Sequence, residues 1–212
     1  MKTKKVFIAI AAMLLVCAMS IAGTLAFLQA RTEKEVTNTF VAAGSGSLFT
    51  DATGKIVLNE SKAILNEATG TYTLDTANKV YENEYSVLPG TTVAKDPAIT
   101  VTGKNNVPAY VYVEIVDATG VNITWEIATG WEATGVVGPH GGTVYHLPSP
   151  IVADLAATAV LKNNQITVAD EADLGLNAGK DMTFYGYIAQ SVVGNSTTAA
   201  DVFTACFPAN NN

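Results

Sequence analysis

The chain has 212 residues, a formal net charge of −7, and only 15% charged side chains against 49% hydrophobic ones. This composition supplies enough apolar material for one buried core, and it contains no basic run or patch that would favour binding to nucleic acid. Alanine, threonine, valine, glycine and asparagine are abundant, which favours strands joined by tight turns.

The N-terminal segment has the layout of a secretory signal peptide. Three lysines near the N-terminus precede an uncharged, apolar run from Val6 to Ala22, and small residues follow at Thr24 and Ala26. A basic start, an apolar stretch and a small-x-small site are typical of export signals. The sequence therefore predicts that residues 1–26 are removed by cleavage between Ala26 and Phe27.

An uncleaved membrane anchor is the alternative for this segment. The uncharged stretch continues through Ala30, so it is long enough to span a bilayer. The basic end would stay on the cytoplasmic side in either case. Both interpretations place the rest of the chain outside the cell, secreted or at the cell surface, with membrane contact only through an uncleaved N-terminus.

Residues 27–47 are expected to form an N-terminal arm followed by a flexible joint. The arm carries apolar side chains at Phe27, Leu28, Val36 and Phe40, and a stretch of small residues rich in glycine and serine follows it. An extended, partly apolar segment can add to the edge of a sheet, so these four residues mark a candidate donor strand. The alternative is an ordinary edge strand of the chain's own domain.

Residues 48–212 are predicted to form one β-sandwich domain. The tripeptide Ala-Thr-Gly recurs at unequal intervals and is interpreted as a turn, because glycine supplies the positive φ that closes a hairpin. It occurs at 52–54, 68–70, 118–120, 128–130 and 133–135. Strands are expected at 55–58, 70–74, 79–88, 98–102, 109–117, 121–127, 143–147, 157–161, 165–168 and 181–193.

Many short strands with close turns, and no strand–helix–strand alternation, predict an all-β, jelly-roll-like antiparallel β-sandwich. Residues 110–116 carry bulky, β-favouring side chains at nearly every position and are expected to form a central strand buried on both faces. Residues 61–67 could instead form a short helical turn. Residues 198–207 have apolar side chains at helical spacing and predict one short C-terminal helix, capped by Thr197 or Thr198.

No catalytic, cofactor-binding or metal-binding residue is predicted, and the chain is not expected to be an enzyme. His140 and His146 do not lie in a His-Glu-x-x-His pattern, and the sequence has neither a Gly-x-Ser-x-Gly elbow nor a phosphate-binding glycine loop. The acidic residues at 170–173 lack the spacing of a calcium loop. Trp125 and Trp131 either pack within the domain or form a carbohydrate-stacking surface.

Cys206 is the one cysteine outside the predicted signal, since Cys17 lies within its apolar run. No internal disulfide is therefore expected in the exported chain, and its fold must depend on a hydrophobic core. Cys206 is interpreted as a small buried hydrophobic side chain.

Three stretches of the chain form a pattern. Gly23–Phe27 precedes Val36–Phe40, Leu88–Gly90 leads into Val93–Pro97, and Phe184–Gln190 precedes the predicted C-terminal helix. Together they resemble the TasA/camelysin family of Gram-positive bacteria. The resemblance implies an exported jelly-roll domain, a signal peptide cut by a dedicated SipW-type signal peptidase, and a structural role in biofilm matrix fibres.

In that family a freed N-terminal segment adds as a strand to the neighbouring subunit, so the resemblance implies self-association into a homopolymer. Two alternatives are a monomeric cell-surface adhesin or binding module, and a camelysin-like metalloprotease, against which the missing His-Glu-x-x-His motif argues. Lys95 and Asp96 are interpreted as residues of the fold, which would form at most an exposed ion pair with each other.

Overall fold

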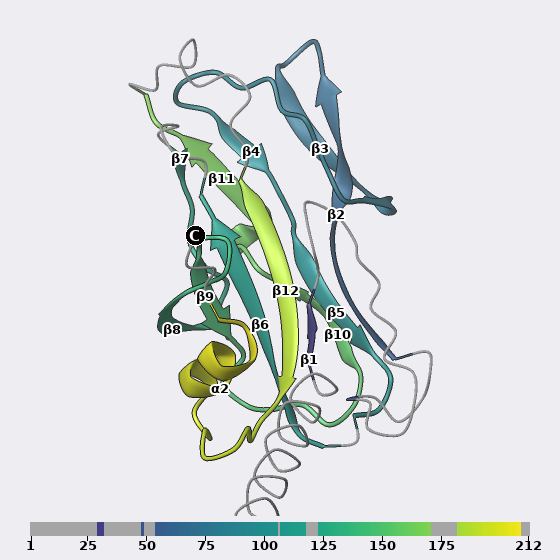
Figure 1. Ribbon diagram of the computed structural model, residues 1–212. Coiled ribbons are helices and arrows are strands. Elements are labelled where there is room, and N and C mark those ends of the chain that lie inside the picture. Colours follow the sequence, from purple (N-terminus) through teal and green to yellow (C-terminus); the bar gives the residue numbers. More distant parts are fainter. Residues whose placement is uncertain are drawn as a thin grey trace, which may run out of the picture.

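The strands and the C-terminal helix build an antiparallel β-sandwich, which confirms the predicted fold class (Figure 1). The computed structural model describes residues 29–31, 48, 54–105, 107–117, 123–170 and 182–208. Every strand pair recorded in this part of the chain is antiparallel, as the close turns of the sequence suggest.

A five-stranded sheet forms one layer of the sandwich. Its strands follow the order β1 (Gln29–Arg31), β12 (Thr183–Gln190), β6 (Ala109–Val116), β9 (Thr143–His146) and β8 (Glu132–Val137). β6 and β12 pair along their whole length, from Ala109 opposite Gln190 to Val116 opposite Thr183. These two strands form the centre from which the rest of the layer extends.

A four-stranded sheet forms the second layer, with a smaller sheet beside it. The four strands follow the order β10 (Leu155–Ala159), β5 (Ala98–Thr102), β2 (Lys55–Asn66) and β3 (Thr71–Val80). The smaller sheet has the order β4 (Thr92–Ala94), β11 (Gln165–Val168) and β7 (Ile123–Thr124), and a short 3-10 turn, η1 (Lys162–Asn164), leads into β11.

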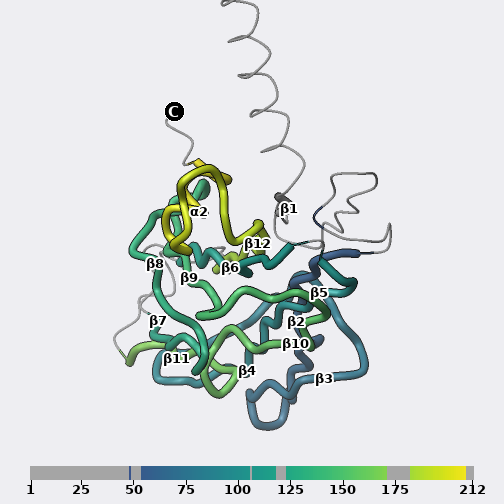
Figure 2. The backbone as a smooth tube through the Cα atoms, turned by 90° about the horizontal axis from the view of Figure 1, so that it is seen from below, coloured from purple at the N-terminus to yellow at the C-terminus, as the bar shows by residue number. Residues whose placement is uncertain are grey.

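The main core lies between the two larger sheets. Alternate residues of β6 point into it, since Val111, Val113 and Ile115 pack against aliphatic side chains of β2 and β5. Figure 2 shows the two layers, with β6 and β12 in one and β2 and β5 in the other. The buried members of this core are Leu48, Ile56, Leu58, Ile99, Val101, Ala109, Val111, Val113, Ile115, Trp131, Val160 and Ile188.

The outer face of the five-stranded sheet is covered by α2 (Ala199–Cys206), so β6 is buried on both faces, as expected (Figure 2). The cap is Thr198, whose Oγ1 accepts a hydrogen bond from the backbone N–H of Asp201. Phe203 of the helix is fully buried and contacts the ring of Tyr112 on β6, with 5.0 Å between the ring centroids. The C-terminal helix is therefore an integral part of the core.

Two of the Ala-Thr-Gly tripeptides form turns, as predicted. Gly70, with φ +67°, closes the β2–β3 hairpin, and Gly130, with φ +100°, precedes Trp131. The interpretation of 133–135 as a turn is wrong, because these residues lie within β8. Gly135 has φ +75° and falls where the pairing of β8 with β9 shifts, so it forms a bulge within the strand.

The structure corrects the predicted elements between β2 and β5. Residues 61–67 form no helical turn, because β2 continues to Asn66 and pairs with β3 residue by residue from Lys62 onward. The predicted strand at 79–88 is also wrong, since β3 ends at Val80 and the next strand is β4. Within this predicted strand, the side chain of Asn83 forms hydrogen bonds to the backbone of β2. It accepts a hydrogen bond from the N–H of Ala63 and donates one to the carbonyl of Ser61.

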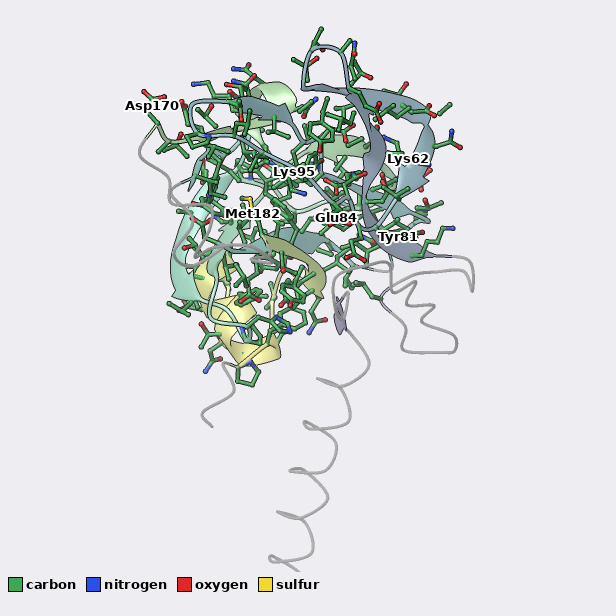
Figure 3. All side chains as sticks on the ribbon, turned by 90° about the horizontal axis from the view of Figure 1, so that it is seen from above. Lys62, Tyr81, Glu84, Lys95, Asp170 and Met182 are labelled. Carbon is green, nitrogen blue, oxygen red and sulfur yellow. The ribbon has the colours of Figure 1, made fainter. Side chains whose placement is uncertain are left out.

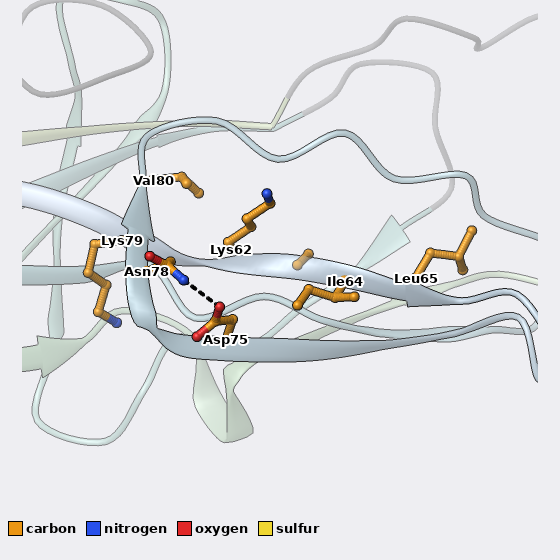
Figure 4. A pocket seen from close by; sticks show the side chains of 8 residues that line it. Lys62, Ile64, Leu65, Asp75, Asn78, Lys79 and Val80 are labelled. Atoms are coloured by element: carbon orange, nitrogen blue, oxygen red, sulfur yellow. Dashed lines mark hydrogen bonds between the residues drawn. The ribbon is translucent and has the colours of Figure 1, made fainter.

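The outer half of the β2–β3 hairpin carries a shallow groove (Figure 4). Ile64 and Leu65 are exposed there, beside Lys62 and Lys79. Asn78 donates a hydrogen bond of 2.6 Å to Asp75, which is the main cause that lowers the pKa of this exposed carboxyl group. Aliphatic side chains and charges of both signs line the same groove, which therefore selects no single class of ligand.

Candidate functional site

The leading segment of the chain contributes a strand to the edge of the five-stranded sheet. Gln29, Ala30 and Arg31 form β1, which pairs antiparallel with β12 opposite Ala189, Ile188 and Tyr187, respectively. The predicted cleavage site at Ala26 and Phe27 and the other predicted donor-strand residues, Leu28, Val36 and Phe40, lie outside the described residues. Part of the predicted arm thus forms an edge strand of the chain's own five-stranded sheet. This is the arrangement that the sequence analysis gave as the alternative to a donor strand.

β12 offers this leading segment a well-anchored edge. Tyr187, Ile188 and Ala189, the three residues opposite β1, are each fully buried. Ile188 points into the main core, whereas Tyr187 and Ala189 belong to the cluster beneath α2. Because both faces of the strand are packed, its backbone is held in place for an added strand to pair with.

A buried polar network lies beside this edge, centred on Glu114 of β6. One carboxylate oxygen of Glu114 accepts from the backbone N–H groups of His140 and Gly142, each at 2.9 Å. The other accepts from the Tyr187 hydroxyl at 2.6 Å and lies 3.0 Å from His140 Nδ1. We assign the imidazole proton to Nδ1, because that nitrogen faces a carboxylate.

This network attaches the turn between β8 and β9 to the central strand. The ring of His140 also stacks on Tyr185 of β12, with 3.6 Å between centroids and 5° between the ring planes. Glu114 itself is fully buried. A buried carboxylate is stable only when donors satisfy its oxygens, and here they come from the turn and from β12 together.

The turn approaches Glu114 so closely that glycine is required in it. A Cβ atom on Gly142 would lie 2.5 Å from the Ile115 carbonyl oxygen and 2.8 Å from Cγ of Glu114. A Cβ atom on Gly138 would lie 2.3 Å from the Glu114 carboxylate carbon. The two glycines therefore allow the backbone to reach a carboxylate that cannot itself move away.

We expect Gly142→Ala to lower the free energy of unfolding by about 2–3 kcal/mol, because the added methyl group would collide with backbone atoms of β6. Urea denaturation followed by tryptophan fluorescence would measure the loss. The matched control is Gly70→Ala, where φ is +67° and nothing lies within 4 Å, so only the cost of the left-handed backbone, about 1 kcal/mol, is expected. Equal losses at the two positions would contradict the close approach.

Lys95 and Asp96, which were interpreted as residues of the fold, do not pair with each other. Lys95 is buried, with its Nζ 2.9 Å from Oε2 of Glu60 on β2. Asp96 accepts from the N–H and the hydroxyl of Ser61 at 2.7 and 2.6 Å, and Lys79 lies 3.7 Å from it. Consecutive residues of an extended chain point in opposite directions, so the two side chains meet different partners.

The remaining candidate residues have structural roles. Trp131 is buried and donates from its indole N–H to the Ala159 carbonyl, whereas Trp125 packs against Tyr145, so the two do not form a common stacking surface. Cys206, the last residue of α2, is buried as expected, and burial raises the pKa of its thiol to about 11. The described residues contain no group of three or more His, Cys, Asp or Glu side chains arranged to hold a metal ion.

The sequence analysis missed the two buried carboxylates, Glu114 and Glu60. Glu114 interrupts an apolar run, and a charge within a strand that is buried on both faces must have partners. That signal indicates that a network exists, but it does not identify the distant residues that complete it.

Comparisons with known proteins found no matching family model, no similar curated protein and no similar solved structure. No helix in the described part of the chain has both the length and the apolar character needed to cross a membrane. The features of this chain that bear on its function are the strand formed by its leading segment and the edge of β12 to which that strand pairs.

Proposed function

We propose that this protein is a secreted structural subunit of extracellular or biofilm matrix fibres. In this proposal the leading segment of one copy pairs with β12 of the next. The observation that carries it is the antiparallel pairing of β1 with β12, because it identifies a sheet edge that the backbone of the leading segment fits. An antiparallel ladder can form within one chain or between two, so the same three residue pairs can join neighbouring copies.

The connection between the strand and the domain is long enough for such an exchange. Residues 32–47 link β1 to Leu48, which is fully buried in the main core. Fully extended, this connection would span at most on the order of 50 Å, which exceeds the width of a small domain. The strand of one copy can therefore reach the edge of a neighbour while its own core stays intact.

Export supplies the expected trigger. Cleavage between Ala26 and Phe27 by a SipW-type signal peptidase would release the leading segment from the membrane, and the freed segment could then pair with another copy. Pairing of β1 with β12 of a neighbour makes the same contacts as pairing with β12 of its own chain. The concentration of subunits therefore decides whether the monomer or the polymer dominates. High local concentration at the cell surface favours the polymer.

A disulfide experiment tests the exchange directly. Two variants of the chain that begins at Phe27 are needed, and both carry Cys206→Ser to remove the native thiol. One variant carries Gln29→Cys and the other carries Ala189→Cys, because the strand register places these two positions opposite each other. We expect a disulfide-linked heterodimer after mixing and mild oxidation, because paired antiparallel residues lie within bridging distance. The control replaces Ala189→Cys with Ala156→Cys, on the exposed part of β10, and should give no heterodimer.

Imaging and sizing of the same preparations complete the test. Negative-stain microscopy should show fibres, and deletion of 27–40 should abolish them while leaving a folded monomer. A chain that begins at Phe27, without added cysteines, and stays monomeric at high concentration would refute the fibre proposal. A monomeric adhesin or binding module would then be the better interpretation.

A further inference from the structure

The pair formed by Lys95 and Glu60 is buried and poorly satisfied. The two side chains are 10% and 7% exposed, and Nζ lies 2.9 Å from Oε2. Neither group makes another side-chain hydrogen bond to the described residues. An ammonium group has three donors and a carboxylate about four acceptor positions, so the single hydrogen bond between them uses only part of their capacity among the described residues.

Two aromatic rings lie near the ammonium group of Lys95. Nζ of Lys95 lies 5.4 Å from the ring centroid of Tyr85 and 5.5 Å from that of Phe184 on β12. Figure 3 shows Lys95 near the middle of the molecule, whereas Lys62 and Asp170 lie toward its outline. The two rings therefore pack beside the ammonium group, and the Glu60 carboxylate is the one acidic group that the described residues place in contact with it.

A third buried polar group lies in the same place. The Tyr85 hydroxyl has no hydrogen-bond partner of ordinary geometry among the described residues, although Asn83 lies near enough to oppose the change in its pKa. The pKa of Tyr85 is raised, mainly by burial and next by the negative charge of Glu60. The hydroxyl therefore keeps its proton. It is thus a donor without an acceptor beside an acid and an amine.

We propose that Lys95 and Glu60 condense to form an intramolecular amide bond between β2 and the connection from β4 to β5. A proton first moves from Nζ to the carboxylate, which gives a neutral amine and a neutral acid. The amine lone pair attacks Cδ, the bond from Cδ to one oxygen breaks, and that oxygen leaves as water with two of the three ammonium protons. No other reactant is needed.

Proximity and burial both favour this reaction. Reactive groups held in contact have effective concentrations of about 10⁵–10⁸ M in well-oriented cases, which can offset the unfavourable release of water from an amine and an acid. Condensation also removes two poorly satisfied charges from the interior. The product links β2 of the four-stranded sheet to the segment that follows β4 of the small sheet, so pulling on the chain would not separate them.

Intact mass measurement of the purified folded chain beginning at Phe27 tests the proposal. We expect a mass lower by one water than its amino acids require. Tryptic digestion should give a branched peptide that joins the segment containing Glu60 to the segment containing Lys95, with no cleavage after Lys95. Lys95→Arg should have the full mass, because arginine keeps the charge and cannot form the bond, whereas Lys79→Arg, at the more exposed lysine nearby, should still lose one water.

The wild-type chain alone is sufficient to overturn the proposal. Full mass, or a digest in which trypsin cleaves after Lys95, would show an uncondensed ion pair. Loss of one water mapped to any other residue would equally reject it. Because this measurement involves one chain and no polymer, its result is independent of the strand-exchange experiment.

Discussion

Replacing Glu114 by alanine should lower the free energy of unfolding by about 3–5 kcal/mol, the loss expected when one member of a buried charged network is removed. The backbone N–H groups of His140 and Gly142 would lose their acceptor, and the Tyr187 hydroxyl would lose its hydrogen bond to Glu114. Each buried donor left without a partner costs about 1–3 kcal/mol. Urea denaturation followed by tryptophan fluorescence would measure the change.

Glu114→Gln separates hydrogen bonding from packing at this position. A glutamine oxygen can accept both backbone N–H groups, while its amide nitrogen can donate to the Tyr187 hydroxyl and to Nδ1 of His140. The second bond requires the imidazole proton to move to Nε2, which is feasible because the His140 side chain is 29% exposed. We therefore expect a loss of about 1–2 kcal/mol. A loss as large as that of alanine would contradict this account of the network.

Much of the architecture was predictable because its signals are local. The bulky run at 110–116 indicated a central strand, and the spacing of Val202, Phe203 and Cys206 indicated a helix capped by Thr197 or Thr198, of which the structure has Thr198. The errors occurred where distant contacts override local pattern. Residues 61–66 are strand because β3 pairs with them, and Ala-Thr-Gly at 133–135 forms a bulge within β8.

The candidate sites were less predictable because their partners lie far apart in sequence. Adjacency in the sequence suggests Asp96 as a partner for Lys95, yet its partner is Glu60, 35 residues earlier. Glu114 accepts hydrogen bonds from the turn after β8 and from Tyr187, which lies 73 residues after Glu114 in the sequence. Sequence alone shows that a charge in an apolar strand needs a partner, whereas only the topology shows which one is available.

The second large effect is expected from Phe203→Ala, which should lower the free energy of unfolding by about 3–5 kcal/mol. Phe203 is fully buried, with its ring centroid 5.0 Å from that of Tyr112 and 5.2 Å from those of Tyr187 and Phe207. Truncation removes these contacts and leaves a cavity between α2 and the sheet. Thr204→Ala is the control, because Thr204 is exposed and a change within about 0.5 kcal/mol is expected there.

Hydrogen exchange would then show whether the loss reaches β12. Phe203 packs directly on Tyr187, which lies opposite Arg31 in the pairing between β1 and β12. We expect faster amide exchange in α2 and in β12 for Phe203→Ala, and no change for Thr204→Ala. If β12 is the edge that receives a neighbour's strand, the Phe203 variant should also form fewer fibres at concentrations where it remains folded. Faster exchange confined to α2, with unchanged fibre yield, would show that the helix does not support this edge.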